Sequence, residues 1–210
     1  MNSKELKSNR AIISGEISSD FTFNHEIKGE KFYLVYVNVP RKSTYIDKLP
    51  VIVSEKLIDV TNNLLGLNVK IQGEYRSYNY YSDNNHKLIL FVFAEVIEVL
   101  NEQIESDENN FVCIEGFITK KPIYRVTPKG RELTEILLAV NRKYRKTSYI
   151  PCILWGRNAV FANRLEVGTR CKMSGRIQSR EYTKKIDEIN TAEMVAYEIS
   201  VNELEVLKNE

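Results

Sequence analysis

Apolar and polar residues alternate in short runs along this chain, and the alternation is clearest towards its C-terminal end. The run from Tyr149 to Trp155 reads Tyr-Ile-Pro-Cys-Ile-Leu-Trp. Because successive side chains of a strand point to opposite sides, Ile150, Cys152 and Leu154 fall on one face. Tyr149 and Trp155 fall on the other face. The pattern predicts a strand with one core face and one aromatic face.

A second run, from Arg170 to Tyr182, shows the same division with cationic side chains. Its apolar face carries Cys171, Met173, Gly175 and Ile177. Its polar face carries Lys172, Arg176, Gln178, Arg180 and Tyr182. Surfaces that bind unpaired bases combine cations with aromatic rings. An ordinary solvated sheet face is the alternative for either strand alone, but the two strands together favour a surface for single-stranded nucleic acid.

The chain also repeats itself at a spacing of about one hundred residues. At a spacing of 101 the matches are Gly15 with Gly116, Ile17 with Ile118, Val39 with Val140, Arg41 with Arg142, Lys42 with Lys143, Pro50 with Pro151, and Ile52 with Ile153. At 102 they are Gly73 with Gly175, Ser77 with Ser179, and Tyr80 with Tyr182, and at 107 Glu98-Val-Leu100 matches Glu205-Val-Leu207. An ordered set of this kind indicates two copies of one structural unit with small loop insertions.

Each copy reads as a strand, a hairpin, two strands, a short helix and two long strands joined by a hairpin. The helices are expected at Lys56 to Leu65 and at Ala159 to Leu165. Five short strands with a helix between the third and fourth describe the OB-fold, a five-stranded Greek-key barrel. A sandwich of short strands is the competing architecture, but a helix at the same point in both copies disfavours it. We therefore predict an all-β protein with two tandem OB-folds, at 1–100 and 111–210, joined by a polar linker at 101–110.

Charge is distributed unevenly along the chain. The 30 Lys and Arg against 28 Asp and Glu give a net charge of only +2. Residues 111–185, however, contain 17 basic against 5 acidic residues, a balance of +12. A concentrated basic segment is the electrostatic footprint of a phosphate-binding surface, whereas solubilising charge normally mixes both signs.

Other features bound the class of protein. No apolar run approaches the roughly 18 residues of a membrane helix, and the first residues do not resemble a signal peptide. The three cysteines are widely spaced, which argues against a disulfide framework or a zinc site and favours a reduced, cytoplasmic setting. His25 and His86 occupy polar turns without a nucleophile or ligand cluster nearby, and no phosphate loop occurs. We expect no enzymatic activity, no catalytic residues, no metal and no cofactor.

The second copy carries an ordered set of family motifs. They are Gly116 and Ile118, Pro122 with Tyr124-Arg125, Thr127-Pro-x-Gly130, Leu138-Ala-Val-Asn-Arg142, Ile150 to Gly156, Ala159, Gly168, and Gly175-Arg-Ile-Gln-Ser-Arg180 followed by Tyr182. From Asn110 to about Leu207 the chain resembles the bacterial single-stranded DNA-binding protein family. The resemblance implies an OB-fold that binds single-stranded DNA in replication, recombination or repair, in assemblies holding four such folds. For a chain with two folds it implies a homodimer.

The resemblance also implies which residues bind. The family's stacking positions are occupied here by Tyr144, Tyr149, Trp155 and Tyr182. The cations expected to line the phosphates are Lys120, Lys121, Arg125, Lys129, Arg142, Lys143, Arg157, Arg176, Arg180, Lys184 and Lys185. The hairpin of the first copy adds Arg76, Tyr78, Tyr80 and Tyr81, for which a simple aromatic-rich hairpin stem is an equal alternative.

The first copy departs from the family pattern at its binding face. Ser43, Lys48 and Ser54 stand opposite Tyr144, Tyr149 and Trp155, and Glu74 stands opposite Arg176. We interpret this copy as a fold with a degenerate binding face. The family usually ends in a glycine-rich stretch with an acidic tip, whereas this sequence stops at Leu207-Lys-Asn-Glu210, so we expect no recruitment through a tail. An alternative interpretation is an adaptor similar to the primosomal replication proteins, which contacts replication or primosome proteins.

Overall fold

The computed structural model describes residues 9–82, 85–101, 109–185 and 191–208. Most of the predicted linker and the side chains of His86 and Lys185 lie outside the described residues. The first half contains β1 (Asn9–Ile17), β2 (Thr22–Ile27), β3 (Glu30–Pro40), β4 (Ile46–Ser54), β5 (Asn68–Ser82) and β6 (Asn85–Leu100). The second half contains β7 (Asn110–Ile118), β8 (Ile123–Val126), β9 (Glu132–Arg142), the 3-10 turn η1 (Lys143–Arg145), β10 (Lys146–Trp155), α1 (Arg157–Ala162), β11 (Arg170–Lys185) and β12 (Thr191–Val206).

The strand pairings confirm two OB-folds. In the first fold β1 pairs antiparallel with β3 and β5, β5 pairs with β6, and β4 closes the barrel by pairing parallel with β6. In the second fold β7, β9, β11, β12 and β10 repeat the same pairings. Each fold carries one short strand more than the five predicted, because the expected hairpin places β2 beside β3 and β8 beside β9. Strands β1–β6 are called the first OB-fold below, and β7–β12 the second.

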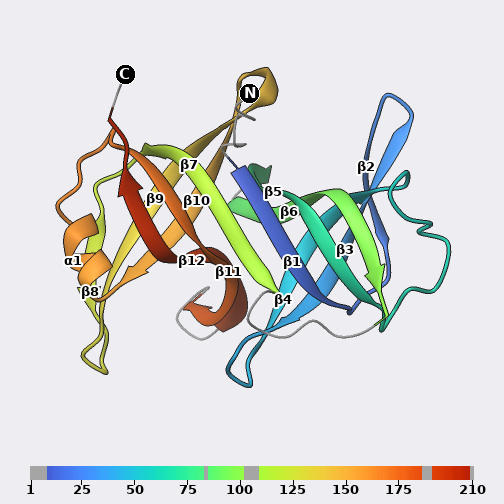
Figure 1. The fold of residues 1–210 in the computed structure, drawn as a ribbon, viewed down its shortest axis with the longest axis horizontal. Helices are drawn as coiled ribbons and strands as arrows, with labels where there is room; N and C mark the ends of the chain where they lie inside the picture. The colour runs from blue at the N-terminus through green and yellow to red at the C-terminus, as the bar shows by residue number, and fades with distance from the viewer. Residues whose placement is uncertain (1–8, 83–84, 102–108, 186–190, 209–210) are drawn as a thin grey trace, which may run out of the picture.

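The two folds share one continuous sheet. Strands β1 and β7 pair antiparallel at the centre of the molecule, so that the 12 strands of the described residues form a single sheet (Figure 1). An asparagine at the start of each of these strands makes the same contact. Asn9 donates to the carbonyl of Tyr75 and accepts from its N–H, and Asn110 does the same with Ile177. The repeat is therefore preserved in detailed hydrogen bonding as well as in topology.

Two of the repeated glycines are required by close backbone approach. A Cβ at Gly73 would lie 2.0 Å from the carbonyl oxygen of Phe93, and one at Gly175 would lie 2.1 Å from that of Ser200. Both glycines sit at a bulge in the pairing of the last two strands of their fold. Any larger residue would force the strands apart at the point where the barrel wall bends.

Burial follows the predicted alternation. In β10 the side chains of Ile150, Cys152 and Leu154 are fully buried. In β11 Met173 and Ile177 are at most 1% exposed. The two barrels together enclose one apolar cluster that is continuous through β1 and β7. The alternation in the sequence thus sets which face of each strand packs in the core.

The expected helix at Lys56 to Leu65 does not form. That segment consists mainly of turns and bends, whereas the second fold has its helix at Arg157–Ala162, which begins two residues and ends three residues before the predicted one. The Asp59 carboxylate accepts hydrogen bonds from the N–H and Oγ1 of Thr61 and from Nδ2 of Asn62. Such local side-chain bonds compete with helical ones, and the neighbouring β-branched residues further disfavour a helix.

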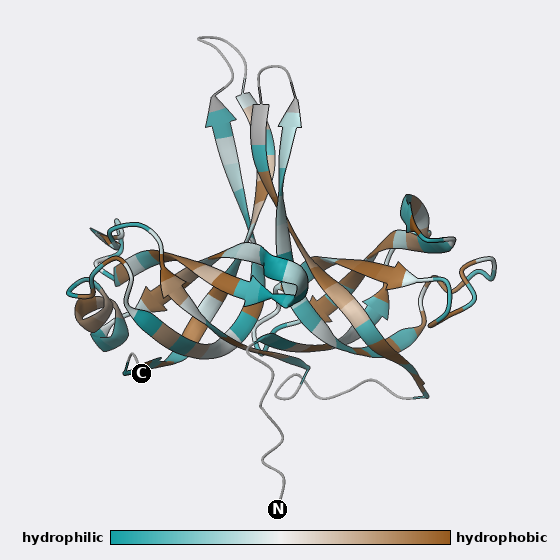
Figure 2. Cartoon of the chain, turned by 90° about the horizontal axis from the view of Figure 1, so that it is seen from above, coloured by the Kyte–Doolittle hydropathy of each residue, from teal (hydrophilic) through white to brown (hydrophobic). Residues whose placement is uncertain are grey.

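The long hairpin of each fold packs against a strand of the other fold. Figure 2 shows β5–β6 and β11–β12 rising side by side from the middle of the molecule. Strand β5 of the first fold contacts β10 of the second, and β11 of the second fold contacts β4 of the first. Residues that belong to one copy in the sequence therefore lie against the other copy in space.

Candidate nucleic-acid interface

The four predicted stacking rings are all accessible. Tyr149, Trp155 and Tyr182 are 37–39% exposed, and Tyr144 is 92% exposed. Tyr144 lies in η1 with a φ of 61°, a left-handed conformation that is uncommon for a residue other than glycine. The structure thus leaves each of these rings available for stacking.

A groove of about 590 Å³ lies between the two OB-folds, beside one of these rings. Its lining consists of Arg41, Tyr45, Arg131, Trp155, Arg176, Gln178, Ser179, Arg180, Glu181 and Ser200. Of the predicted binding residues it brings together Trp155, Arg176 and Arg180. Four arginines and two aromatic rings in one concavity are the groups that hold phosphates and stack bases.

The groove also contains three residues that sequence reasoning missed as binding residues. Arg41 matched Arg142 in the repeat, and Arg131 was included in the basic segment, but neither fact indicated a position in the site. Tyr45 had no signal, because its counterpart at a spacing of 101 is Lys146. Arg41 and Tyr45 come from the first copy, and only the packing of the two folds brings them to the second.

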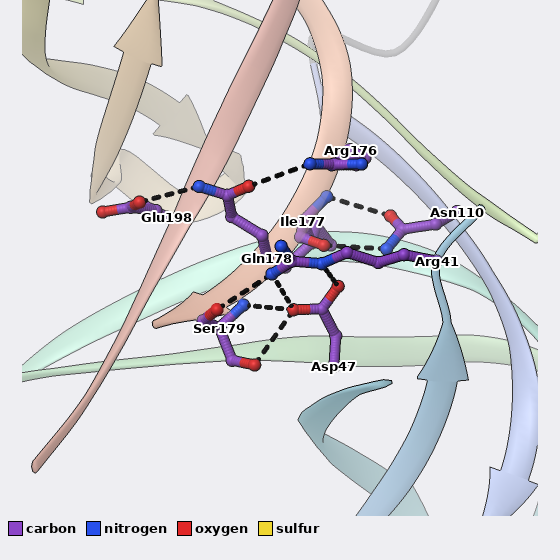
Figure 3. Close-up of polar contacts among 8 residues, drawn as sticks. All are labelled: Arg41, Asp47, Asn110, Arg176, Ile177, Gln178, Ser179 and Glu198. Atoms are coloured by element: carbon purple, nitrogen blue, oxygen red, sulfur yellow. Dashed lines mark hydrogen bonds and ion pairs between the residues drawn. The ribbon is translucent and has the colours of Figure 1, made fainter. Parts of the chain in front are cut away.

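An ion pair links Arg41, which lines the groove, to the buried Asp47 (Figure 3). Asp47 on β4 has no exposed surface and accepts from Nε and Nη2 of Arg41 at 2.7 and 2.6 Å. The same carboxylate accepts from the N–H and Oγ of Ser179 on β11, at 2.6 and 2.9 Å. Arg41 in turn donates to the Ser179 carbonyl at 3.0 Å. These bonds, which hold the second fold's hairpin on the first fold, also raise the pKa of Arg41, chiefly through its hydrogen bonds to Asp47.

Arg176 and Gln178 line the groove next to this ion pair. Gln178 donates to Glu198 at 2.8 Å (Figure 3). Glu198 also lies 3.7 Å from Arg180. Arg176 donates only to the neutral Gln178, at 3.4 Å, and its buried Nε has no hydrogen-bond partner among the described residues. Burial lowers the pKa of Arg176, and the nearby charge of Arg41 lowers it further. The groove is therefore short of negative charge at Arg176.

The opposite junction between the folds lacks the carboxylate. There Ser148 stands in the position of Asp47, accepting from the N–H of Ser77 at 3.1 Å, while Ser77 accepts from the N–H of Tyr149 at 2.8 Å. The Nε of Arg142, the counterpart of Arg41, is buried without a hydrogen-bond partner in the described part of the chain. Burial lowers the pKa of Arg142, and the charge of Arg76 adds to the effect. Predicted residues Arg76, Arg142 and Tyr149 are thus brought to a second junction.

The other predicted cations are spread over the second fold outside the groove. Lys120 and Lys121 lie exposed before β8, Lys129 is in the β8–β9 turn, Lys143 is in η1, Arg157 begins α1, and Lys184 is near the end of β11. Arg125 is paired with Glu135 at 2.8 Å, and Arg76 with Glu74 at 2.8 Å. Internal pairing reduces the charge that these two arginines can offer to a phosphate.

The predicted tyrosines of the first copy lie on the β5–β6 hairpin. Tyr78, Tyr80 and Tyr81 are 44–66% exposed, and the ring of Tyr78 is tilted against that of Phe91. The base of this hairpin is bonded to β10 of the second fold through Ser77 and Tyr149. The strand β5 that carries these rings consequently lies against β10 of the second fold.

The corresponding face of the first fold is filled with apolar side chains. Phe32, Ile52 and Phe91 form a separate buried cluster, against which Phe93 packs. The guanidinium of Arg76 lies over the Phe93 ring, 3.7 Å from its centroid. Glu30, which stands at the position of the groove residue Arg131, accepts hydrogen bonds from Ser54 and Lys56. This arrangement places Glu30, Ser54 and Phe93 where the second fold has Arg131, Trp155 and Ser200.

The buried thiols offer no nucleophile. Burial raises the pKa of Cys171 to about 11, and that of Cys152 well above its ordinary value, so that both stay protonated at neutral pH. The described residues contain no group of three or more His, Cys, Asp or Glu side chains that could hold a metal ion. Nor does any helix in the described part of the chain have the length and apolar character to cross a membrane.

Comparison with known proteins agrees with the fold and motifs of the second copy. Residues 109–207 match the model of the Single-strand binding protein family. These residues belong to that family. Single-stranded DNA-binding protein A of Bacillus subtilis is 38% identical over 80 residues, which cover 35% of this chain and 46% of the relative. The single-stranded DNA-binding protein of Clostridium tetani is 37% identical over 83 residues, covering 36% and 57%. The chain thus spans about half the length of these curated relatives.

The likeness of fold extends over both copies. The crystal structure of the wild-type single-stranded DNA binding protein from Thermus aquaticus superposes with a TM-score of 0.71. The match covers 96% of this chain and 94% of that one, at 17% sequence identity. The arrangement of two OB-folds in one chain therefore occurs in a solved structure, and the sequence resemblance to the family is confirmed for the second copy.

Proposed function

We propose that this protein binds single-stranded DNA without strong sequence preference, in DNA replication, recombination or repair. The observation that carries the proposal is the groove of a family OB-fold in which Trp155, Arg131 and Arg176 converge. Every base has a π face, so that stacking is tolerant of sequence and contributes about 1–3 kcal/mol per base in such sites. Arginines supply the phosphate contacts, which carry no sequence information.

The binding surface extends beyond the groove along the second fold. Tyr144, Tyr149 and Tyr182 present further rings, and the exposed lysines of the second fold lie on the same OB-fold. Separate rings and cations of this kind would follow an extended strand over several nucleotides.

We also propose a homodimer that brings together four OB-folds, with residues 1–100 and 111–210 as the two domains of each chain and 101–110 as their linker. One chain of 24.4 kDa supplies two folds. Light scattering of the purified protein should then give twice this mass, about 49 kDa. A monomeric mass at micromolar concentration would contradict the dimer and leave DNA binding unaffected.

Titration with poly-dT tests the main proposal. Trp155 is the only tryptophan, so its fluorescence should be quenched as bases stack on it. Five or more phosphate contacts, at about −0.7 each, predict a log–log salt slope of roughly −3.5 or steeper. A slope near zero, or equal affinity for duplex DNA, would contradict single-strand binding and favour the protein-contact adaptor.

A further inference from the structure

The groove is built from both OB-folds. Arg41 and Tyr45 lie in the short segment between β3 and β4 of the first fold, and the other lining residues come from the second. The two parts are held together by the Asp47 carboxylate, which bonds Arg41 of its own fold and Ser179 of the other. The shape of the groove therefore depends on the fixed contact between the folds.

Tyr45 is oriented in advance for contact with a ligand. It is 40% exposed, and the Arg41 guanidinium lies over its ring, 4.3 Å from the centroid. Arg41 is itself immobilised by its three hydrogen bonds to Asp47 and Ser179. A ring supported in this way loses little conformational freedom when a base stacks on its exposed part.

The charges in the groove are unbalanced. Four arginines and a single carboxylate, Glu181, line it. Asp47 neutralises Arg41, and Glu198 lies 3.7 Å from Arg180. Arg131 and Arg176 have no carboxylate partner among the residues that the structure describes. A phosphate diester fits this deficit, because it is an anion and carries several acceptor oxygens.

We propose that the groove is a composite nucleotide site in which single-stranded DNA crosses from the second OB-fold to the first. Bases stack on Trp155 and Tyr45, and the phosphate between them lies against Arg131 and Arg176. The inference rests on the proposed function and extends it: the first fold takes part in binding through Tyr45, although its own corresponding face is filled.

Removing the ring of Tyr45 tests this crossing point. We expect Tyr45→Ala to weaken binding of a fluorescein-labelled dT oligonucleotide by about tenfold, measured by anisotropy, because one stacked base is lost. Tyr45→Trp should bind as well as the wild type. Phe23→Ala is the matched control, since Phe23 is an exposed ring of the same fold whose described aromatic contact is with Tyr33. Equal affinities for Tyr45→Ala, Phe23→Ala and the wild type would overturn the inference.

Cross-linking supplies a direct measurement of contact. Irradiation of the complex with an oligonucleotide containing 5-iododeoxyuridine should join DNA to peptides that contain Tyr45 and Trp155. Cross-links confined to the second fold would overturn the inference while leaving the proposed function in place. Failure of the wild-type protein to bind dT at all would overturn both.

Discussion

The groove of the second OB-fold and the corresponding surface of the first have the same backbone arrangement but carry side chains of opposite character. Around the groove stand Arg131, Trp155, Arg176 and Ser200. At the equivalent positions the first fold has Glu30, Ser54, Glu74 and Phe93. The side chains that open and charge one surface are thus replaced by ones that close and neutralise the other.

The closed surface shows how few changes are needed. Phe93 stands at the position of the smaller Ser200 and packs against Phe32, Ile52 and Phe91, and the Arg76 guanidinium lies over its ring. Glu74 pairs with Arg76 at 2.8 Å, which cancels the charge that remains. An OB-fold can therefore keep its pairing pattern while one of its faces carries a second apolar cluster.

The two junctions between the folds differ in a similar way. One contains the buried Asp47, which satisfies Arg41 and Ser179 together. The other has Ser148 at that position and leaves the Nε of Arg142 without a partner in the described structure. The two junctions thus differ by one buried carboxylate: Asp47 forms an ion pair at the first, and the Nε of Arg142 has no hydrogen-bond partner among the described residues at the second.

The largest expected effect comes from removing that carboxylate. Asp47→Ala should lower the free energy of unfolding by about 3–5 kcal/mol, because Arg41 would remain partly buried without its counter-ion. Ser148→Ala at the other junction should cost only about 1–3 kcal/mol, because the buried N–H of Ser77 would lose its neutral acceptor. Urea unfolding followed by circular dichroism measures both. Equal losses would show that the two junctions are equivalent after all.

The second-largest effect is expected when a groove residue is replaced by the residue at the equivalent position of the first fold. Trp155→Ser, which copies Ser54, should weaken binding of labelled dT by about 1–3 kcal/mol while the protein stays folded, because Trp155 lies outside the apolar core cluster. Phe161→Ser, at an exposed ring on α1 outside the groove, is the control. If both variants bound alike, the groove would have no special part in binding.

A smaller effect is expected from reversing one charge. Arg176→Glu copies Glu74 and should remove one phosphate contact, reducing the steepness of the salt slope by about 0.7 and the affinity at 0.1 M salt by roughly fivefold. Arg164→Glu makes the same change in charge on an exposed residue that does not line the groove. Identical salt slopes for the two variants would attribute the effect to net charge alone.

The smallest effect is predicted for the hairpin of the first copy. Tyr80→Ala should cost clearly less affinity for dT than Tyr182→Ala, because Tyr182 follows the cationic Arg176 and Arg180 on its strand, whereas Tyr80 belongs to the copy whose face is closed. Anisotropy titrations of the two variants side by side provide the measurement. A loss for Tyr80→Ala that matched the loss for Tyr182→Ala would contradict the interpretation that the first copy has a degenerate binding face.

The sequence by itself determined the OB-folds, because their signals are local. Alternation at a period of two fixed which side chains of β10 and β11 are buried, and the repeated glycines mark the places where the backbones approach most closely. The motifs of residues 109–207 were sufficient to identify the family. The same local reasoning failed at Lys56 to Leu65, where the side-chain bonds of Asp59 override the expected helix.

Only the tertiary structure decided how the two copies share a surface. Asp47 and Ser179 are 132 residues apart in the chain, and nothing in the local sequence marks them as partners. The packing of the second fold's long hairpin against the first fold brings Arg41 and Tyr45 into the groove of the second fold. The packing of Phe93 under Arg76 fills the corresponding surface of the first fold. The period of the sequence pattern shows which face of a strand is apolar. Which residues lie opposite the polar face depends on how whole strands and hairpins pack together, and contacts between residues distant in the sequence determine that packing.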